Sequence, residues 1–545
     1  MTAIRSCTGG LALGVGSGAS GNLTHRAETV SSKARRGVWA HPGRAGRRAA
    51  APAAGGVPRT ILARGVARGP PERRARLPTG SRGVYPPFPS NHRSETRVPK
   101  FIVHGGNRIK GTIRPNGNKN AALPMLAATL LTEEDVFLEN VPRIRDVLTL
   151  MNLLEVLGAE TEWTGPNEVR VRASSVGNTQ LDAAAAARIR ASILLAGPML
   201  ARAGGMQLPP PGGDVIGRRR VDTHFLALKK LGARVVEEAG VWALQADGRL
   251  RGGNMFLDEP SVTATENAVM AASLADGETV IRNAAAEPHV QDLCHMLVAM
   301  GCEIEGIGTG TLRVQGRERL SGCRARITSD HIEVGSFIGL AAVTRGELTI
   351  EDAAVHHLDS TLIGFGRLGL KVEVRGDDLY IPGGQEMEVT LDMGGHISKV
   401  DDGPWPAFPA DLTSIALVTA TQCRGNILIH EKMFESRMFF ADKLVGMGAR
   451  LVLCDPHRVL VIGPSQLHGA IVESPDIRAG MGLLIAALGA DGRSEIFNVG
   501  QIERGYERID ERLQALGADI RRADSRADAA EVDDAARQMF IRAAK

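Results

Sequence analysis

Aromatic residues, paired cysteines and long apolar runs are all scarce in this 545-residue chain. Phe, Trp and Tyr make up only 4% of it, so its core must be built from aliphatic and alanine side chains. The six cysteines show neither a CxxC pair nor a metal-ligand spacing, which favours a reduced protein with buried thiols. No apolar run approaches the roughly 18 residues that a membrane span needs. We therefore expect a cytoplasmic globular protein with no membrane segment and no metal.

Acidic residues are nearly missing from the first hundred positions. Residues 1–100 hold 16 Arg and 2 Lys against three glutamates, whereas the whole chain has a net charge of +4. This segment is rich in Gly, Pro, Ala and Arg and lacks apolar periodicity, so we predict a disordered basic N-terminal extension. It could be a transit peptide, a nucleic-acid-binding arm or translated sequence upstream of the working protein. We favour the last reading and expect no nucleic-acid partner.

From Phe101 onward, a unit of 68 to 79 residues recurs six times. Each unit has an apolar helical stretch, then Leu-Gly or Met-Gly, then a short β-like run. The marker glycines are Gly158, Gly232, Gly301, Gly369, Gly448 and Gly517. Glycine stops a helix because it accepts the left-handed conformation, and a second helix in each unit is apolar nearly all round, which predicts burial. A period held six times predicts a repetitive α/β fold of strand–helix–strand–helix–strand–strand units.

The loop at residues 211–220 interrupts this pattern. It combines three glycines, one carboxylate and three guanidinium groups: Gly212, Gly213, Gly217, Asp214, Arg218, Arg219 and Arg220. The glycines permit backbone angles with positive φ. A mobile loop that places an acid beside cations suits a phosphate-bearing substrate that also needs a proton moved. A basic surface turn is the alternative.

Seven motifs, spread in order over the chain, resemble those of the enolpyruvyl transferase family. They are NKNAALP at 118–124, RAS at 190–192, GGDVIGRR at 212–219, FPAD at 408–411, ESR at 435–437, DIRA at 476–479 and RGYERI at 504–509. The resemblance runs from about Phe101 to Arg522. It implies two similar inside-out α/β barrel domains of three units each, with the active site between them. One domain would hold residues 101–118 plus 330–522 and the other residues 119–329, and residues 523–545 would form a C-terminal tail.

Within that family, the motifs are most similar to the branch that acts on UDP-N-acetylglucosamine. The resemblance therefore implies transfer of the enolpyruvyl group of phosphoenolpyruvate to the 3′-hydroxyl of UDP-N-acetylglucosamine, with release of phosphate, as the first committed step of peptidoglycan precursor synthesis. It implies no cofactor, and we expect a monomer or a weak homo-oligomer. The alternatives are another nucleotide-sugar acceptor, or a non-catalytic paralogue that binds a UDP-sugar.

The resemblance also implies roles for individual residues. Lys119 would contact phosphoenolpyruvate, Asn120 the amino sugar, Asp411 would be the base for the sugar hydroxyl, and Asp214 the acid. The other implied substrate-binding residues are Arg190, Arg219, Arg437, Arg478, Arg504, Asp222, His224, Ser261, Val262 and Thr263. Arg145 would help to order the site. Taken by themselves, Lys119 could be a solvated surface lysine, and Asp411 could cap the apolar helix that follows it.

Two positions depart from the family pattern, because Asp214 stands where the family usually has cysteine and Arg220 where it has proline. Aspartate has an ordinary pKa of about 3.9 and cysteine about 8.5, and neighbouring arginines should lower the pKa of Asp214 further. We predict that Asp214 is protonated only when substrate is bound. Epoxide inhibitors of the fosfomycin type need a thiolate at this position, so we predict resistance to covalent inactivation.

Overall fold

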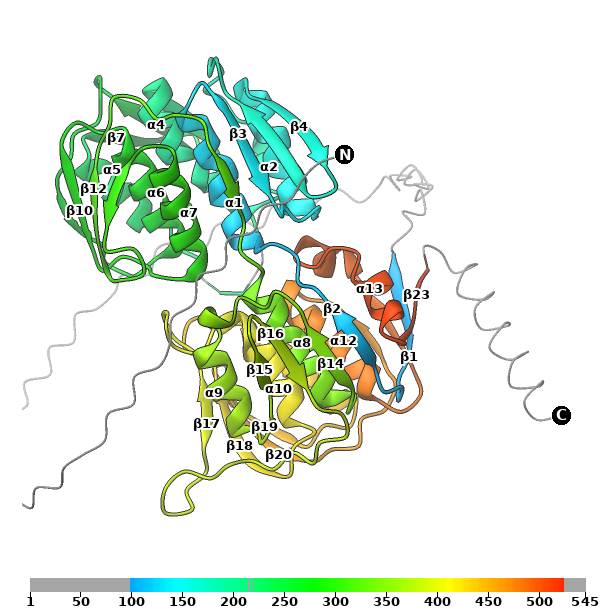
Figure 1. Cartoon of the computed structure of the whole chain (residues 1–545). Coiled ribbons are helices and arrows are strands. Elements are labelled where there is room, and N and C mark those ends of the chain that lie inside the picture. Colours follow the sequence, from blue (N-terminus) through cyan, green and yellow to red (C-terminus); the bar gives the residue numbers. More distant parts are fainter. Residues whose placement is uncertain (1–98, 214–215, 218, 524–545) are drawn as a thin grey trace, which may run out of the picture. The chain divides into compact units, whose positions relative to one another are not determined.

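The computed structural model describes residues 99–213, 216–217 and 219–523 (Figure 1). The predictions for the basic extension, for Asp214 and Arg218, and for the tail after residue 523 lie outside these described residues. The described elements all belong to one structural unit of the chain.

Two large hydrophobic cores are built from different parts of the sequence. The first core takes its buried side chains from residues 121–327, and the second core takes its own from residues 101–113 and 332–520. The chain passes between the cores twice, and the two passing segments are paired: the Asn118 amide donates to the Thr328 carbonyl and the Asp330 amide to the Asn116 carbonyl, both over 2.8 Å. Gly117 is required here, because a Cβ at this position would lie 1.8 Å from the Asn140 carbonyl oxygen.

Six sheets correspond to the six sequence units, and three of them surround the first core. Their strand orders are β13-β3-β5-β4, β6-β8-β7 and β11-β12-β10-β9. The elements of the first core are α1 (Lys119–Ala128), η1 (Thr129–Leu131), β3 (Asp135–Glu139), α2 (Arg145–Leu157), β4 (Glu160–Gly165), β5 (Glu168–Arg172), α3 (Ala183–Ala186), η2 (Arg190–Leu195), α4 (Ala196–Ala203), β6 (Gly205–Leu208), α5 (Asp222–Lys230), β7 (Ala233–Glu238), β8 (Val241–Ala246), β9 (Asn254–Phe256), α6 (Val262–Ser273), β10 (Glu278–Arg282), α7 (Pro288–Ala299), β11 (Glu303–Glu305), β12 (Thr311–Gln315) and β13 (Arg324–Arg326).

The other three sheets surround the second core. Their strand orders are β15-β16-β14-β2, β17-β18-β20-β19 and β21-β22-β1-β23. The elements of the second core are β1 (Lys100–His104), β2 (Lys110–Ile113), α8 (His331–Val343), β14 (Glu347–Ile350), η3 (Val355–His357), α9 (Asp359–Arg367), β15 (Glu373–Arg375), β16 (Asp378–Ile381), β17 (Lys399–Asp401), η4 (Ala410–Leu412), α10 (Thr413–Ala420), β18 (Gly425–His430), η5 (Arg437–Phe440), α11 (Ala441–Gly446), β19 (Leu451–Asp455), β20 (Arg458–Gly463), β21 (Ile471–Glu473), α12 (Ile477–Gly489), β22 (Arg493–Phe497), η6 (Val499–Arg504), α13 (Ile509–Ala515) and β23 (Asp519–Ala523).

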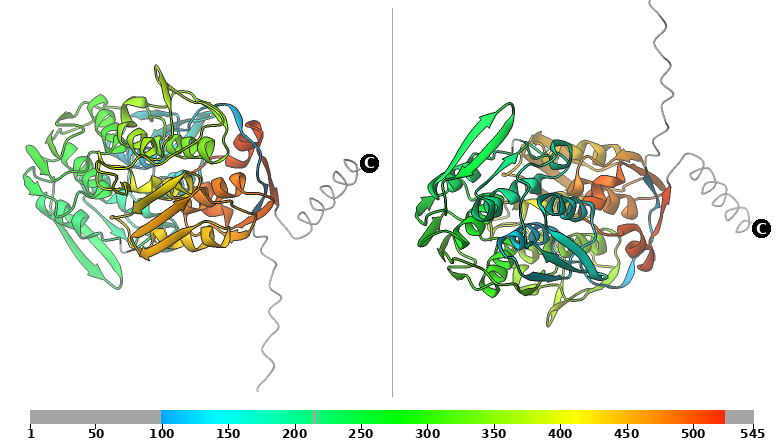
Figure 2. Two further views of the ribbon diagram at one scale, coloured as in Figure 1. Left: turned by 90° about the horizontal axis from the view of Figure 1, so that it is seen from below. Right: turned by 90° about the horizontal axis from the view of Figure 1, so that it is seen from above.

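The predicted order of strands and helices holds in most units. In the third, β9 pairs in parallel with β10 after the intervening helix, and β12 pairs antiparallel with both β10 and β11. The second unit differs, because its expected first strand is reduced to a single bridge between Gln180 and Gln207. The sixth takes one strand from the start of the chain: β1 lies between β22 and β23, with Phe101 opposite both Ile496 and Arg522. The blue and red ends of the described chain therefore lie side by side (Figure 2).

The helices predicted to be buried lie inside each core. Helices α8, α10 and α12 pack on one another, and nearly every residue of the three is buried. All six marker glycines have φ between 80° and 107°, so each ends its helix in the left-handed conformation as predicted. The starts of several of the described helices carry the functional residues described next.

Candidate active site

A cavity of about 470 Å³ is lined by residues from elements of both cores. It contains Lys119 and Asn120 from α1, and Asp411 from η4. The other residues implied by the family resemblance that line it are Arg190, Arg219, Ser261, Val262, Thr263, Arg437, Arg478 and Arg504. Motifs that are hundreds of residues apart in the sequence therefore meet in one place.

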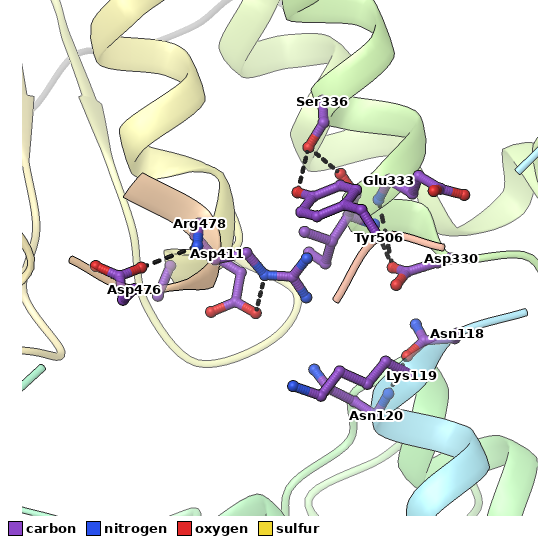
Figure 3. A network of polar contacts seen from close by, with 12 residues as sticks. Asn118, Lys119, Asn120, Asp330, Glu333, Ser336, Asp411, Asp476, Arg478 and Tyr506 are labelled. Atoms are coloured by element: carbon purple, nitrogen blue, oxygen red, sulfur yellow. Dashed lines mark hydrogen bonds and ion pairs between the residues drawn. The ribbon is translucent and has the colours of Figure 1, made fainter. Parts of the chain in front are cut away.

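Lys119 and Asn120 reach the cavity because Asn118 begins α1. The Asn118 carbonyl oxygen Oδ1 accepts hydrogen bonds from the amides of Asn120 (2.7 Å) and Ala121 (3.2 Å), which is a regular N-cap. Figure 3 shows Lys119 and Asn120 extending from this turn on the side of Asp411 and Arg478. Lys119 is 8% exposed, so it is not the solvated surface lysine that its position alone would allow.

Asp146, in the first turn of α2, holds two of the cations. Its carboxylate lies 2.8 Å from Lys119 Nζ and accepts a hydrogen bond of 2.9 Å from Arg504 Nε. Burial alone would raise the pKa of Asp146, but Lys119 and Arg504 lower it below its ordinary value. Asp146 was not predicted from the sequence. Its neighbour Arg145, which was predicted to order the site, has a side chain that is 61% exposed and lies 3.7 Å from Glu503.

Asp411 is held between two arginines and does not cap a helix. It accepts hydrogen bonds from Arg437 Nη2 (2.9 Å) and Arg478 Nε (3.0 Å), while α10 begins without a side-chain cap. Burial would raise the pKa of Asp411, but Arg478 and Arg437 hold it well below its usual range. Its side chain is 27% exposed, whereas those of Arg437 and Arg478 are 3% and 5% exposed. The carboxylate therefore faces the cavity in its ionised form.

The two arginines beside Asp411 are fixed by their surroundings. Arg478 follows Asp476, which caps α12, and its guanidinium lies 5.4 Å from the centre of the Tyr506 ring. Tyr506 is in turn hydrogen-bonded to Ser336 Oγ at 2.8 Å. The buried Nη1 atoms of Arg437 and Arg478 donate no hydrogen bond within the described part of the chain, although both residues line the cavity. The two guanidinium groups are thus held in fixed positions at the wall of the cavity.

Three described residues of the 211–220 loop, Ile216, Arg219 and Arg220, line this cavity. Gly213 and Gly217 have positive φ angles of 109° and 128°, as predicted. Gly212 does not have a positive φ, but glycine is still required there because a Cβ would lie 1.6 Å from the Ala187 carbonyl oxygen. The Ile216 carbonyl accepts a hydrogen bond from the Ser436 amide. Arg190 donates to the Arg220 carbonyl at 2.7 Å, and burial together with the charge of Arg219 lowers the pKa of Arg190 to about 10.

Two of the implied substrate-binding residues do not line the cavity. The Asp222 side chain is 62% exposed and pairs with Arg220 at 2.9 Å. His224 is buried, and its Nε2 lies 2.8 Å from Thr263 Oγ1. It therefore contacts a residue that lines the cavity without lining the cavity itself. Burial lowers the pKa of His224 to about 3, which keeps the ring neutral.

One wall of the cavity was not anticipated from the sequence. It contains His289, His331 and Trp405, with the two imidazole rings stacked 6.2 Å apart and tilted by 8°. Burial lowers the pKa of both histidines to about 3. The same side of the cavity also contains Glu266 and Glu287. None of these residues belongs to a motif with a local signature. The one signal in the sequence is that two titratable residues, Glu287 and His289, stand at the start of the largely apolar helix α7.

Comparisons with known proteins identify the family. Residues 103–513 match the family model described as EPSP synthase (3-phosphoshikimate 1-carboxyvinyltransferase). The chain belongs to the enolpyruvyl transferase family, and it is an enzyme. It is 60% identical over 427 residues to the UDP-N-acetylglucosamine 1-carboxyvinyltransferase of Bradyrhizobium diazoefficiens, a match that covers 78% of this chain and 99% of the relative. It is 54% identical over 421 residues to the protein of the same name from Treponema denticola, covering 77% and 98% of the two chains.

Solved structures agree with this family assignment. The enolpyruvyl transferase NikO from Streptomyces tendae matches with a TM-score of 0.70 and 26% identity over 78% of this chain and 99% of its own. EPSP synthase from Acinetobacter baumannii matches with a TM-score of 0.61 at 17% identity, covering 78% of this chain and all of its own, and shares the mixed α/β fold.

The described residues contain neither a metal-binding cluster nor a membrane-spanning helix. No group of three or more His, Cys, Asp or Glu side chains is placed to hold a metal ion among residues 99–213, 216–217 and 219–523. Over the same ranges, none of the helices is long and apolar enough to cross a membrane.

Proposed function

We propose that this enolpyruvyl transferase uses phosphoenolpyruvate as donor and the 3′-hydroxyl of UDP-N-acetylglucosamine as acceptor, and that it acts in the cytoplasm in peptidoglycan precursor synthesis. The observation that carries the proposal is the placement of Asp411 between Arg437 and Arg478 in a cavity that also holds Lys119 and Arg504. The names of relatives that are 54% and 60% identical over nearly their whole length support the choice of acceptor.

The cations of the cavity match the charges of the donor. Phosphoenolpyruvate carries a phosphate and a carboxylate, and planar guanidinium groups bind both in bidentate fashion. In our proposal Lys119, Arg478 and Arg504 bind the donor, while Arg437 holds the base. Arg190 and Arg219, on the side of the loop, would bind phosphate groups of the nucleotide sugar or of the donor. Asn120 would contact the amino sugar.

The reaction needs one base and one acid that exchange protons with different atoms. Asp411 would accept the proton of the sugar hydroxyl while the oxygen of that hydroxyl bonds to C2 of the donor. An acid would give a proton to the C3 methylene group in the same step. In the second step C3 would lose a proton while the bond from C2 to the phosphate oxygen breaks, which yields the enol ether and inorganic phosphate. Asp214 would be the acid, and its loop would exclude water during the reaction.

Phosphate release tests this proposal directly. The purified full chain is incubated with phosphoenolpyruvate and, in separate reactions, with UDP-N-acetylglucosamine and a panel of other nucleotide sugars. We expect phosphate to appear with UDP-N-acetylglucosamine, together with a product heavier by one enolpyruvyl group in the mass spectrum. Release with a different nucleotide sugar alone would replace the acceptor, and binding of UDP-N-acetylglucosamine without any release would favour a non-catalytic protein.

A further inference from the structure

Two glutamates on one wall of the cavity have no role in the reaction as proposed above. Glu266 lies in α6, three and four residues beyond Thr263 and Val262, so all three share a face of the helix. Glu287 stands immediately before α7. Both glutamates line the cavity, and Glu266 is only 1% exposed.

Neither glutamate is neutralised by a cation. The buried Oε1 of Glu266 and Oε2 of Glu287 have no hydrogen-bond partner, and neither residue forms an ion pair within the described residues. This is unlike Asp146 and Asp411, which are each held by two basic side chains. Burial raises the pKa of Glu266 well above its ordinary value, and Glu287 adds to the effect. Burial also raises the pKa of Glu287, partly opposed by backbone amides that include that of Trp405.

The chemistry of the cavity explains why such a pair must carry protons. An ionised carboxylate without a partner is costly to bury, and two of them would repel a diphosphate ligand in the same cavity. A protonated carboxyl group has an O–H that can donate a hydrogen bond and an oxygen that can accept one. Such a group suits the neutral part of an amino sugar, which offers hydroxyl groups and an amide carbonyl.

We propose that Glu266 and Glu287 are acceptor-binding residues that, as neutral carboxyl groups, donate hydrogen bonds to the hydroxyl or amide groups of the nucleotide sugar. This inference rests on the proposed function, because it assigns part of the binding site for the same acceptor. It adds a consequence for pH. When the pair loses a proton in alkaline solution, a donor is lost and a negative charge appears beside an anionic ligand, so the acceptor binds more weakly.

Other titratable groups border this wall and could also respond to pH. They are His224 from α5, Arg190 from η2, Lys119 from α1, and His289 and Cys294 from α7. Burial holds the pKa of each histidine near 3 and raises the pKa of Cys294 to about 12. These three groups therefore do not change charge between pH 6 and 8.5, and Lys119 and Arg190 are common to every variant compared below.

The test is isothermal titration of UDP-N-acetylglucosamine into the full chain, without phosphoenolpyruvate, between pH 6 and 8.5. Wild type is compared with Glu266→Gln and Glu287→Gln, which remain neutral at every pH and keep the shape of the side chain. Glu305→Gln, an exposed glutamate of β11, is the matched control. Each titration is repeated in two buffers of different ionisation enthalpy, which reports proton uptake by the wild-type protein without any substitution.

We expect the wild-type and Glu305→Gln affinities to fall about fivefold or more across this range, with proton uptake on binding at the alkaline end. Each cavity variant keeps only one of the two carboxyl groups, so its affinity should fall clearly less with pH than that of wild type, by about twofold. Equal pH dependence in wild type and both cavity variants, or the absence of proton uptake by wild type, would overturn the assignment of the pair. A failure of wild type to bind UDP-N-acetylglucosamine at any pH would instead contradict the proposed acceptor.

Discussion

Replacement of Asp146 by Asn should lower the thermal stability of the protein, and bound phosphoenolpyruvate should restore part of the loss. The carboxylate is buried, with 5% of its side chain exposed, and it lies within 2.9 Å of both Lys119 and Arg504. Asparagine has nearly the same shape but no charge, so the two cations would face each other without a counter-charge. Removing one partner from a buried ion pair costs about 3–5 kcal/mol.

The expected magnitude follows from the size of the first core, which takes its buried side chains from residues 121–327. For a domain of 150–250 residues, a loss of 1 kcal/mol lowers Tm by about 2–4 °C, so Asp146→Asn should lower Tm by about 6–20 °C. A ligand at one hundred times its Kd adds about 2.7 kcal/mol of stability. Because the donor brings negative charge to the same two cations, it should raise the Tm of the variant more than that of wild type.

Thermal unfolding with and without phosphoenolpyruvate measures both effects. Asp247→Asn is the matched control, because Asp247 pairs with Arg234 at 2.7 Å but both side chains are more than 60% exposed. An exposed pair contributes about 0–1 kcal/mol, so this control should change little. The reasoning would be refuted if Asp146→Asn melted within 2 °C of wild type and gained no more from the donor than wild type does.

Three further predictions concern other groups of the protein. Asp411→Asn should lower kcat by about 10²–10⁴-fold while UDP-N-acetylglucosamine still binds, as phosphate release and calorimetry would establish, because the base is lost but the arginines remain; kcat above one tenth of wild type would exclude Asp411 as the base. Burial and the neighbouring carboxyl group of Asp402 raise the pKa of Glu431 to about 8. Folding of wild type should therefore lose stability as pH rises from about 5 to 8, whereas Glu431→Gln should not, and parallel denaturation curves at both pH values would contradict this. Wild type should form no covalent adduct with an epoxide of the fosfomycin type, whereas Asp214→Cys should gain the mass of one inhibitor molecule. An adduct on the wild-type loop would refute the sequence-based prediction. If Asp214→Asn and Asp214→Cys both keep full kcat, Asp214 is not the acid.

The repetitive fold could be predicted from the sequence because its signals are local. A glycine at the end of a helix and an apolar surface all round a second helix are readable within ten or fifteen residues, and they recur in every unit. The exchange of strands between units was not readable in this way. Nothing in residues 100–104 indicates that β1 would lie between β22 and β23, because that pairing joins positions about 400 residues apart.

The residues of the candidate site fall into the same two groups, those with a local sequence signal and those that only the fold brings together. Lys119, Asp411, Arg478 and Arg504 belong to motifs that could be compared with a family. Asp146 belongs to no such motif, and its importance depends on Lys119 before it and Arg504 far beyond it. Its neighbour Arg145 was predicted to help order the site because it stands where relatives often carry lysine, yet its side chain is 61% exposed. The wall of Glu266, Glu287, His289 and His331 was missed for the same reason, since each residue is ordinary until the fold brings them to one cavity.

The charge arrangement of the site has a consequence for the order of events. Two carboxylates already offset part of the positive charge of the cavity: Asp146 faces Lys119 and Arg504, and Asp411 faces Arg437 and Arg478. With both arginines engaged, the pKa of Asp411 lies so low that it is a weak base. A phosphate or carboxylate that engages Arg478 would offset part of this positive charge and so raise the basicity of Asp411. We therefore expect that the acceptor hydroxyl loses its proton only when phosphoenolpyruvate is bound. The negative charge that we predict to raise the pKa of Asp214, so that it takes up a proton from solvent, would then also raise the basicity of Asp411.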